Sequence, residues 1–128
     1  FLPPRPVESW INVLNTTTFP SACVQQLSTD GLPVLQEWKP TTPISEDCLY
    51  LSVAVPRPRQ SKLPVMVWIH GGGFYSGSSG LGMYDLRTLA SEENIIAVSI
   101  QYRVASLGFL YAGISDAPGN AGMLDQVA

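Results

Sequence analysis

The stretch VMVWIHGGGFYSGSSG, residues 65–80, decides which kind of fold this sequence can form. Residues 65–69 are continuously apolar, which is typical of a strand buried on both faces of a sheet. They are followed by His70 and then by three glycines, Gly71 to Gly73. Glycine has no Cβ and adopts positive φ easily, so another group can approach its main chain closely. The stretch therefore predicts a buried strand that ends in a loop with accessible backbone N–H groups.

The segments around this stretch complete an α/β pattern. Residues 49–55 are rich in β-branched and aromatic side chains and predict a strand. Residues 84–94 predict a helix, because apolar residues fall on one face and Asp85 stands at the N-cap position. Residues 95–100 are a second continuous apolar run, and residues 119–128 predict the start of a further helix. Strand, glycine loop, helix and strand form a βαβ unit, so we predict an α/β fold with a mainly parallel sheet.

Composition and charge restrict the possible functions. The sequence is 45% apolar with a net charge of −3, which allows one modest core and lacks the basic surface that nucleic acid requires. It has no apolar run of about 18 residues or more, the length that predicts a transmembrane helix. Residues 1–47 are rich in proline and predict an irregular lead-in. Because the chain begins at Phe1 and its last residues carry no helix stop signal, we expect residues 1–128 to be the amino-terminal part of one longer domain.

Two features are typical of a secreted protein. Cys23 and Cys48 can form a disulfide or remain buried thiols, and the residues alone leave both alternatives open. Asn15 begins the sequon Asn15-Thr16-Thr17, which is an acceptor for N-glycosylation in a secreted chain, although such triplets also arise by chance.

The glycine loop has three possible roles. N–H groups of Gly72 and Gly73 that point at one oxygen would form an oxyanion hole, and an HGGG sequence after an early strand is typical of α/β-hydrolase esterases. A tight turn without chemistry is the second possibility. A phosphate-binding loop is the third, although the sequence contains neither GxxxxGK[ST] nor GxGxxG.

The sequence lacks the rest of a serine-hydrolase active site. None of Ser76, Ser78 and Ser79 has glycine at both −2 and +2, as a nucleophile elbow requires. The sequence has one histidine, His70, and it belongs to the glycine loop. A Ser-His-acid triad cannot be completed within residues 1–128, so we expect these residues alone to be inactive. The proposed chemistry implies no metal and no cofactor.

Four blocks of sequence resemble the type-B carboxylesterase family. They are EDCLYLSVAVP (46–56), HGGGFYSGSS (70–79), YRVASLGFL (102–110) and DAPGNAGMLDQ (116–126). Their order and spacing match the family, and the resemblance implies a partial α/β-hydrolase fold and a serine esterase activity. Within the family the sequence is similar to the cholinesterase branch, because Trp38 stands ten residues before Cys48.

The resemblance assigns roles to individual residues. Gly72 and Gly73 would hold the oxyanion, and Trp38 would bind the trimethylammonium group of choline through its aromatic face. Tyr75 resembles a tyrosine that lines the narrow part of the active-site gorge, and Tyr84 resembles one that backs the tryptophan. For the three aromatic residues the alternative is packing of the side chain without contact to substrate.

The resemblance also bears on the cysteines and on selectivity. It implies that Cys23 and Cys48 form the first disulfide of the family. His70 replaces a tyrosine of the cholinesterase pattern, and Gln26 and Ser28 replace the tyrosine and aspartate of a peripheral cation site. These departures weaken the expectation of selectivity for cationic substrates.

The function that the resemblance implies is an extracellular serine esterase that hydrolyses choline esters through an acyl-enzyme. Its expected partner is a small-molecule ester, and any oligomer contact or membrane anchor would come from later parts of the chain. A general carboxylesterase of broader substrate range is one alternative. A non-catalytic adhesion protein of the same fold is the other, because the nucleophile lies outside residues 1–128.

Overall fold

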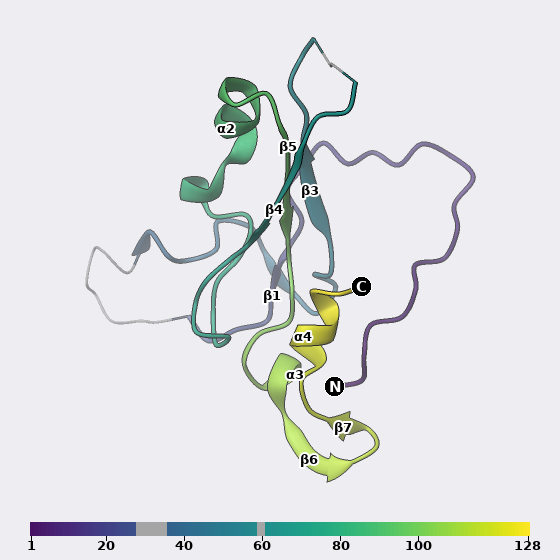
Figure 1. The fold of residues 1–128 in the computed structure, drawn as a ribbon. Helices are drawn as coiled ribbons and strands as arrows, with labels where there is room; N and C mark the ends of the chain where they lie inside the picture. The colour runs from purple at the N-terminus through teal and green to yellow at the C-terminus, as the bar shows by residue number, and fades with distance from the viewer. Residues whose placement is uncertain (28–35, 59–60) are drawn as a thin grey trace.

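The structure is a computed structural model that describes residues 1–27, 36–58 and 61–128. Within these ranges the chain forms a three-stranded sheet, two two-stranded sheets and short helices (Figure 1). In chain order the elements are β1 (Ala22–Cys23), β2 (Ile44–Ser45), β3 (Leu51–Ala54), β4 (Val65–Ile69), the 3-10 helix η1 (Gly82–Tyr84), α2 (Leu86–Glu92), β5 (Ile96–Ile100), α3 (Ala105–Phe109), β6 (Tyr111–Ile114), β7 (Ala117–Pro118) and α4 (Ala121–Asp125). Among the described helices, none is long and apolar enough to cross a membrane.

The largest described sheet contains the predicted βαβ unit. Strands β4 and β5 pair in parallel, from Val65 opposite Ile96 to Ile69 opposite Ile100, and α2 lies in the crossover between them. Helix α2 packs against β5 (Figure 1). The three strands predicted from the sequence, the helix between two of them and the helix near residue 120 are therefore confirmed as elements, with ends that differ by a few residues.

The prediction of a mainly parallel sheet is wrong for the described part of the chain, because the sheet is mixed. Its strand order is β3-β5-β4, and β3 runs antiparallel to β5. A short connection, residues 55–64, joins β3 to β4. Parallel neighbours need a crossover of about a dozen residues or more, whereas a shorter connection reverses the chain. Strands β3 and β4 consequently run in opposite directions on the two sides of β5.

The prediction that residues 65–69 are buried on both faces is also wrong in this structure. Val65 and Val67 are 59% and 56% exposed, whereas Ala97 in the neighbouring strand is 1% exposed. The difference follows from strand order, because β5 is central and β4 is at the edge of the sheet. Within the described residues, β5 is the sole ladder partner of β4.

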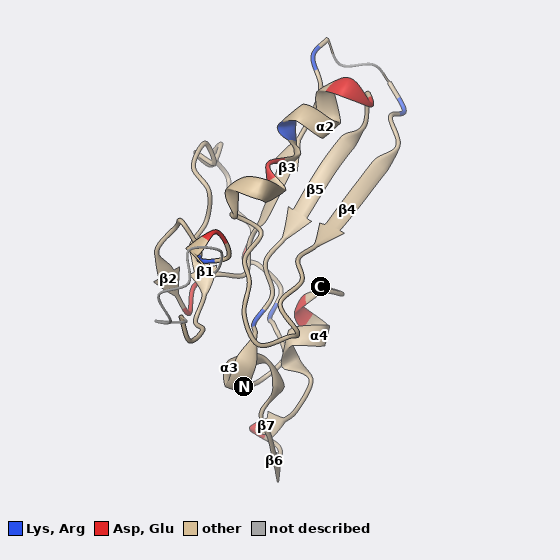
Figure 2. Ribbon diagram, turned by 90° about the vertical axis from the view of Figure 1, so that its left-hand side faces the viewer, with Lys and Arg blue, Asp and Glu red and all other residues tan. Residues whose placement is uncertain are grey.

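The start of α2 confirms the predicted cap. The Oδ1 atom of Asp85 accepts a hydrogen bond of 3.0 Å from the backbone N–H of Arg87. The same carboxylate forms a salt bridge of 2.6 Å with the Arg87 guanidinium, and Figure 2 shows acidic and basic residues at this end of the helix. Hydrogen bonding and the cation together lower the pKa of Asp85 to about 2.

The buried core lies where β4 and β5 end. Figure 1 shows that β1, α3 and α4 gather at this end of the sheet. The buried residues at this end are both apolar and polar and include Ala22, Cys23, Cys48, His70, Ser78, Ser79, Leu81, Gln101, Tyr102 and Val104. The glycine loop therefore lies against buried side chains, such as that of Tyr102.

The described part of the lead-in is mostly irregular, as predicted, apart from β1 and β2. These two-residue strands, together with α3, β6 and β7, are not predicted from the sequence. Helix α3 is short and begins at Ala105, which has φ of 51°, so it carries no capping signal that a sequence pattern could reveal. Residues 59 and 60, which lie between β3 and β4 in the sequence, are outside the described residues.

Candidate active site

The glycine loop turns sharply directly after β4. The carbonyl oxygen of Gly72 accepts hydrogen bonds from the N–H groups of Tyr75 (3.0 Å) and Ser76 (3.1 Å). Gly72 has φ of 122°, and a Cβ at this position would collide with the carbonyl oxygen of Ser76. Gly73 has φ of 61°. Both positions therefore require glycine for a local steric or conformational reason.

The N–H groups of Gly72 and Gly73 are available to a ligand. Within the described residues, neither N–H donates a hydrogen bond to the chain. A Cβ at Gly73 would find no atom within 4 Å, so the space beside this residue is open. Consecutive unpaired N–H groups in a loop with positive φ are suited to bind a negatively charged oxygen. The loop therefore has the donors that an oxyanion hole needs.

The side chain of His70 is held in place by contacts with the loop and with Tyr102, so it is not free to act as a base. Its ring is buried and stacks on Tyr102 with 4.4 Å between ring centroids, while Nδ1 lies 2.9 Å from the Gly71 carbonyl oxygen. Burial lowers the pKa of His70, and the hydrogen bond to the Gly71 carbonyl partly opposes this effect. The imidazole is therefore neutral near pH 7, with Nδ1–H as the donor to the carbonyl.

Two further hydrogen bonds fix carbonyl groups of the loop. The Tyr102 hydroxyl donates to the His70 carbonyl oxygen at 2.9 Å. The N–H of Ala105 donates to the Phe74 carbonyl oxygen at 2.8 Å. Because both donors follow β5, the loop after one strand is held by the segment after its parallel neighbour.

Two glutamines hold the far side of the loop, and sequence reasoning missed both. Gln25 accepts from the Gly77 N–H at 2.8 Å and donates to the Gly77 carbonyl oxygen at 2.8 Å. Gln101 accepts from the Ser79 N–H at 3.1 Å and donates to Ser78 Oγ at 2.9 Å. These contacts span 52 residues for Gln25 and 22 or 23 residues for Gln101, so no local pattern signals them.

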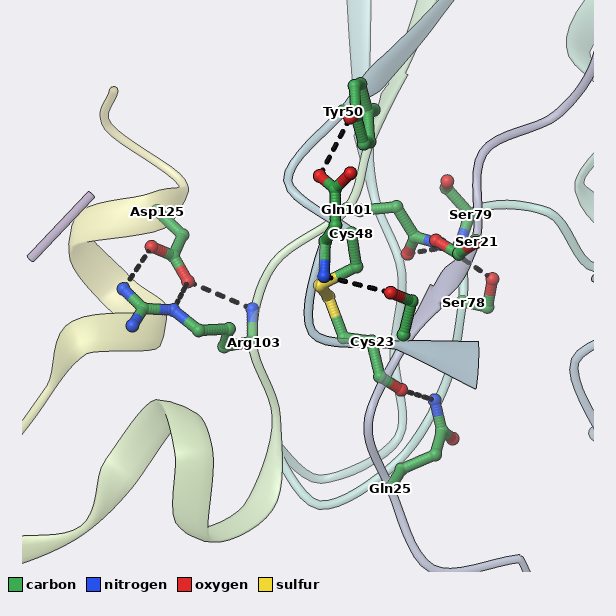
Figure 3. The surroundings of a disulfide bond; sticks show 12 residues. Ser21, Cys23, Gln25, Cys48, Tyr50, Ser78, Ser79, Gln101, Arg103 and Asp125 are labelled. Carbon is green, nitrogen blue, oxygen red and sulfur yellow. Dashed lines mark hydrogen bonds and ion pairs between the residues drawn. A yellow bond between two sulfur atoms is a disulfide. The ribbon is translucent and has the colours of Figure 1, made fainter. Parts of the chain in front are cut away.

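The disulfide between Cys23 and Cys48 is present, which confirms that expectation. Both cysteines are buried, and the bond closes a separation of 25 residues. Figure 3 shows the disulfide among the side chains of Gln25, Gln101, Ser78 and Ser79. The covalent bond therefore lies within the group of side chains that supports the glycine loop.

The structure does not bring the three predicted aromatic residues together. Trp38 is 52% exposed and lies on a turn, and residues 28–35 before it are outside the described residues. The Tyr75 hydroxyl donates to Gln26 Oε1 at 2.8 Å. Tyr84 packs against Trp68 at 5.1 Å between ring centroids, and no ring contact with Trp38 occurs in the described part of the chain. Roles for these side chains in substrate binding stay predictions.

Asn15 and Ser28 are the last two residues singled out from the sequence. Asn15 is exposed, and its Oδ1 accepts from the Thr17 hydroxyl at 2.8 Å, so the acceptor side chain of the sequon is accessible. Glycosylation of Asn15 stays a prediction. Ser28, one of the departures from the cholinesterase pattern, lies outside the described residues.

A hollow of about 690 Å³ lies away from the glycine loop. It is lined by the lead-in residues 15–21 together with residues of β3, β5 and the start of α2. Tyr84 contributes to its wall, whereas Gly72, Gly73 and Trp38 do not. We therefore do not assign this hollow to the candidate active site.

Comparison with known proteins defines the class to which this site belongs. The sequence model of the carboxylesterase family matches residues 1–128, so the chain belongs to the carboxylesterase family. It is 49% identical to the acetylcholinesterase of Bungarus fasciatus over 129 residues and 51% identical to that of Electrophorus electricus over 130 residues. Each alignment covers 98% of this chain but only 21% and 20% of the respective relative, so the chain spans about a fifth of their length.

Proposed function

We propose that residues 1–128 are the amino-terminal part of a single α/β-hydrolase domain in a serine esterase of the cholinesterase type. The observation that carries this proposal is the pair of unengaged N–H groups at Gly72 and Gly73 in a chain of the carboxylesterase family. The substrate class is an ester of choline, hydrolysed through an acyl-enzyme to choline and a carboxylate. The disulfide fits an extracellular location.

In the proposed mechanism a serine outside these residues attacks the ester carbonyl. The negative charge that develops on the carbonyl oxygen is stabilised by the N–H groups of Gly72 and Gly73. Loss of one such donor typically costs roughly 2.7–4 kcal/mol of transition-state stabilisation. The groups are held in place before substrate arrives, so they need no rearrangement during the reaction.

Trp38 provides the cation site in this proposal. A trimethylammonium group has no N–H donor, so an aromatic face is the surface that can attract it, at roughly 2 kcal/mol or more when water is excluded. The 52% exposure of Trp38 leaves its ring accessible in the described chain. Tyr75 and Tyr84 would line the path between Trp38 and the oxyanion donors.

The test compares two thioesters on the full-length protein, namely acetylthiocholine and its uncharged carbon isostere. We expect Trp38→Ala to lower kcat/KM for acetylthiocholine by about 30-fold, which corresponds to about 2 kcal/mol, and to leave the isostere within threefold. Equal losses on both substrates would remove the cation role of Trp38. Trp10→Ala is a matched control, because Trp10 is also exposed, at 57%.

A general carboxylesterase is the second candidate. The observation that favours it is His70, because vertebrate cholinesterases usually have tyrosine at this position and histidine is common there in general carboxylesterases. Equal kcat/KM values of the wild-type protein for the charged and uncharged thioesters would support this candidate. Absence of hydrolysis of either substrate, in a folded full-length protein, would support the non-catalytic adhesion alternative.

A further inference from the structure

We propose that Gln25 is a positioning residue for the oxyanion hole. Its carboxamide holds Gly77, and this contact fixes the direction of the N–H groups of Gly72 and Gly73 at the other end of the loop. The proposal rests on the proposed esterase function, because it concerns the geometry of that site.

The contact between Gln25 and Gly77 uses every hydrogen-bonding group available to the pair. Oε1 accepts from the Gly77 N–H and Nε2 donates to the Gly77 carbonyl oxygen, both at 2.8 Å. The second hydrogen of Nε2 is directed to the Cys23 carbonyl oxygen at 3.0 Å (Figure 3). A carboxamide that makes three such bonds has one orientation, so it fixes both polar groups of Gly77.

Gly77 in turn contacts the beginning of the loop. It has φ of 117°, and a Cβ built on it would meet the Gly71 carbonyl oxygen and would lie 2.6 Å from His70 Nδ1. The two ends of the loop therefore touch at Gly71 and Gly77. Because Gly71 directly precedes Gly72, a shift of Gly77 displaces the residues that carry the oxyanion donors.

Gln25 is itself fixed by the disulfide. It stands two residues after Cys23, which is bonded to Cys48, and both cysteines are buried. The neighbouring Gln26 bonds instead to the exposed hydroxyl of Tyr75. The contact thus connects a covalently closed segment with the loop of the candidate active site.

The chemistry of this contact demands a carboxamide of this length. A carboxylate could accept from the Gly77 N–H, but its second oxygen would face the carbonyl oxygens of Gly77 and Cys23 without a proton to donate. Alanine would remove all three bonds, and asparagine would retain the amide on a shorter side chain. Gln25→Ala, Gln25→Glu and Gln25→Asn therefore form a graded series, with Gln25→Asn serving where a more severe variant folds poorly.

The test uses the full-length protein and three measurements. The first is the steady-state kinetics, kcat and KM, for an uncharged acetyl ester. The second is the inhibition constant of a trifluoromethyl ketone, whose tetrahedral adduct places an oxyanion in the hole. The third is amide hydrogen exchange at Gly77. Gln126→Ala is the matched control, because the side chain of Gln126 donates only to the Met123 sulfur among the described residues.

We expect Gln25→Ala to lower kcat by about 10- to 100-fold, the effect of a displacement of about 1 Å, with KM within threefold. The inhibition constant for the ketone should rise by the same factor, which a loss of stability alone would not produce. The Gly77 amide should exchange at least about tenfold faster, because its acceptor is gone. Gln126→Ala should change none of these values by more than twofold.

The outcomes separate the two proposals. If the wild-type protein hydrolyses no ester, the proposed function fails, and Gly77 exchange still shows whether Gln25 holds the loop. If the wild-type protein is active and Gln25→Ala keeps kcat and ketone inhibition within twofold, the positioning role is overturned. A fall in kcat without a matching change in ketone inhibition overturns it as well, because the loss would then arise outside the oxyanion hole.

Discussion

The carboxylate of Asp125 accepts three hydrogen bonds from Arg103. The donors are the Arg103 backbone N–H at 3.0 Å, Nε at 2.8 Å and a terminal guanidinium nitrogen at 2.7 Å (Figure 3). The Asp125 side chain is 0% exposed and that of Arg103 is 16% exposed. This bidentate pair joins α4 to the segment that follows β5, and Gly108 and Gly122 both pack against the Arg103 carbonyl.

Asp125→Asn should therefore destabilise the protein strongly. The variant leaves a largely buried guanidinium without its counter-charge, and removal of one partner of a buried pair typically costs about 3–5 kcal/mol. Urea unfolding of the full-length protein measures the loss. Asp116→Asn is the control, since Asp116 is exposed, and it should change the free energy of unfolding by less than about 0.5 kcal/mol. Similar losses in both variants would contradict the assigned importance of the Arg103 pair.

Alanine substitutions in the glycine loop should have sharply different effects. Gly72→Ala places a Cβ against the Ser76 carbonyl and should abolish the activity proposed for this protein. Gly73→Ala meets no atom but forces φ of 61° on a non-glycine residue, at a cost of about 1–2 kcal/mol. Gly71→Ala meets no atom and requires no positive φ, so it serves as the control with activity within a few-fold of wild type. Equal activity of Gly71→Ala and Gly72→Ala would show that the loop geometry is not as described.

His70 should make stability fall in mild acid. Burial lowers the pKa of His70 below its ordinary value of 6.5, so the unfolded chain binds the proton more readily than the folded chain. Its contribution to stability is complete above pH 6.5 and is lost as the pH falls from there toward the lowered pKa, with a slope of at most about 1.4 kcal/mol per pH unit. His70→Phe retains an aromatic ring against Tyr102 and removes the titration. The difference between the unfolding free energies of variant and wild type should therefore change between about pH 7 and about pH 5, and a constant difference would refute this account.

The contribution of Asp85 to stability should be lost at a lower pH than that of His70. Hydrogen bonds and the Arg87 cation lower its pKa from 3.8 to about 2, so its stabilising contribution is present above pH 3.8 and disappears as the pH falls toward 2. The site is exposed, so we expect the cap itself to dominate: Asp85→Ala should cost about 1 kcal/mol at pH 7. Asp85→Asn retains a capping oxygen without the charge and should recover most of that loss. If Asp85→Asn is as unstable as Asp85→Ala, the charge rather than the cap holds the helix start.

Removal of the disulfide should destabilise the protein by about 3–4 kcal/mol, since it releases a closed segment of 25 residues in the unfolded chain. The variant with both Cys23→Ser and Cys48→Ser tests this by urea unfolding, with the reduced wild-type protein as a second measurement. A loss below about 1 kcal/mol in both would show that the bond constrains the unfolded chain little.

The sequence predicts the βαβ unit because its signals are local. Continuous apolar runs, a cap residue and a glycine loop each fall within a few neighbouring positions, and each yields an element that the structure contains. The sequence does not predict which strand becomes central, because that choice depends on pairings between distant segments. The continuous apolar run of β4 predicts a strand buried on both faces, yet only β5 has neighbours on both sides in the described sheet.

The distinction between local signals and distant contacts also explains which residues of the candidate active site could be predicted from the sequence. Gly72 and Gly73 can be predicted as candidate donors because three adjacent glycines follow an apolar run directly in the sequence. Gln25 and Gln101 were missed because a glutamine acquires its function from a main-chain group far along the chain. Trp38, Tyr75 and Tyr84 are assigned through resemblance, and no ring contact among them occurs in the described residues, so their shared role is left to the kinetic test.

The unpaired edge of β4 has a practical consequence for anyone who produces these 128 residues in isolation. Val65 and Val67 line an exposed apolar strand, and within the described residues one side of that strand has no ladder partner. Such edges recruit strands from other molecules. Bacterial expression of this segment should therefore yield insoluble aggregates, and a lysine in place of Val67 should shift part of the material to the supernatant.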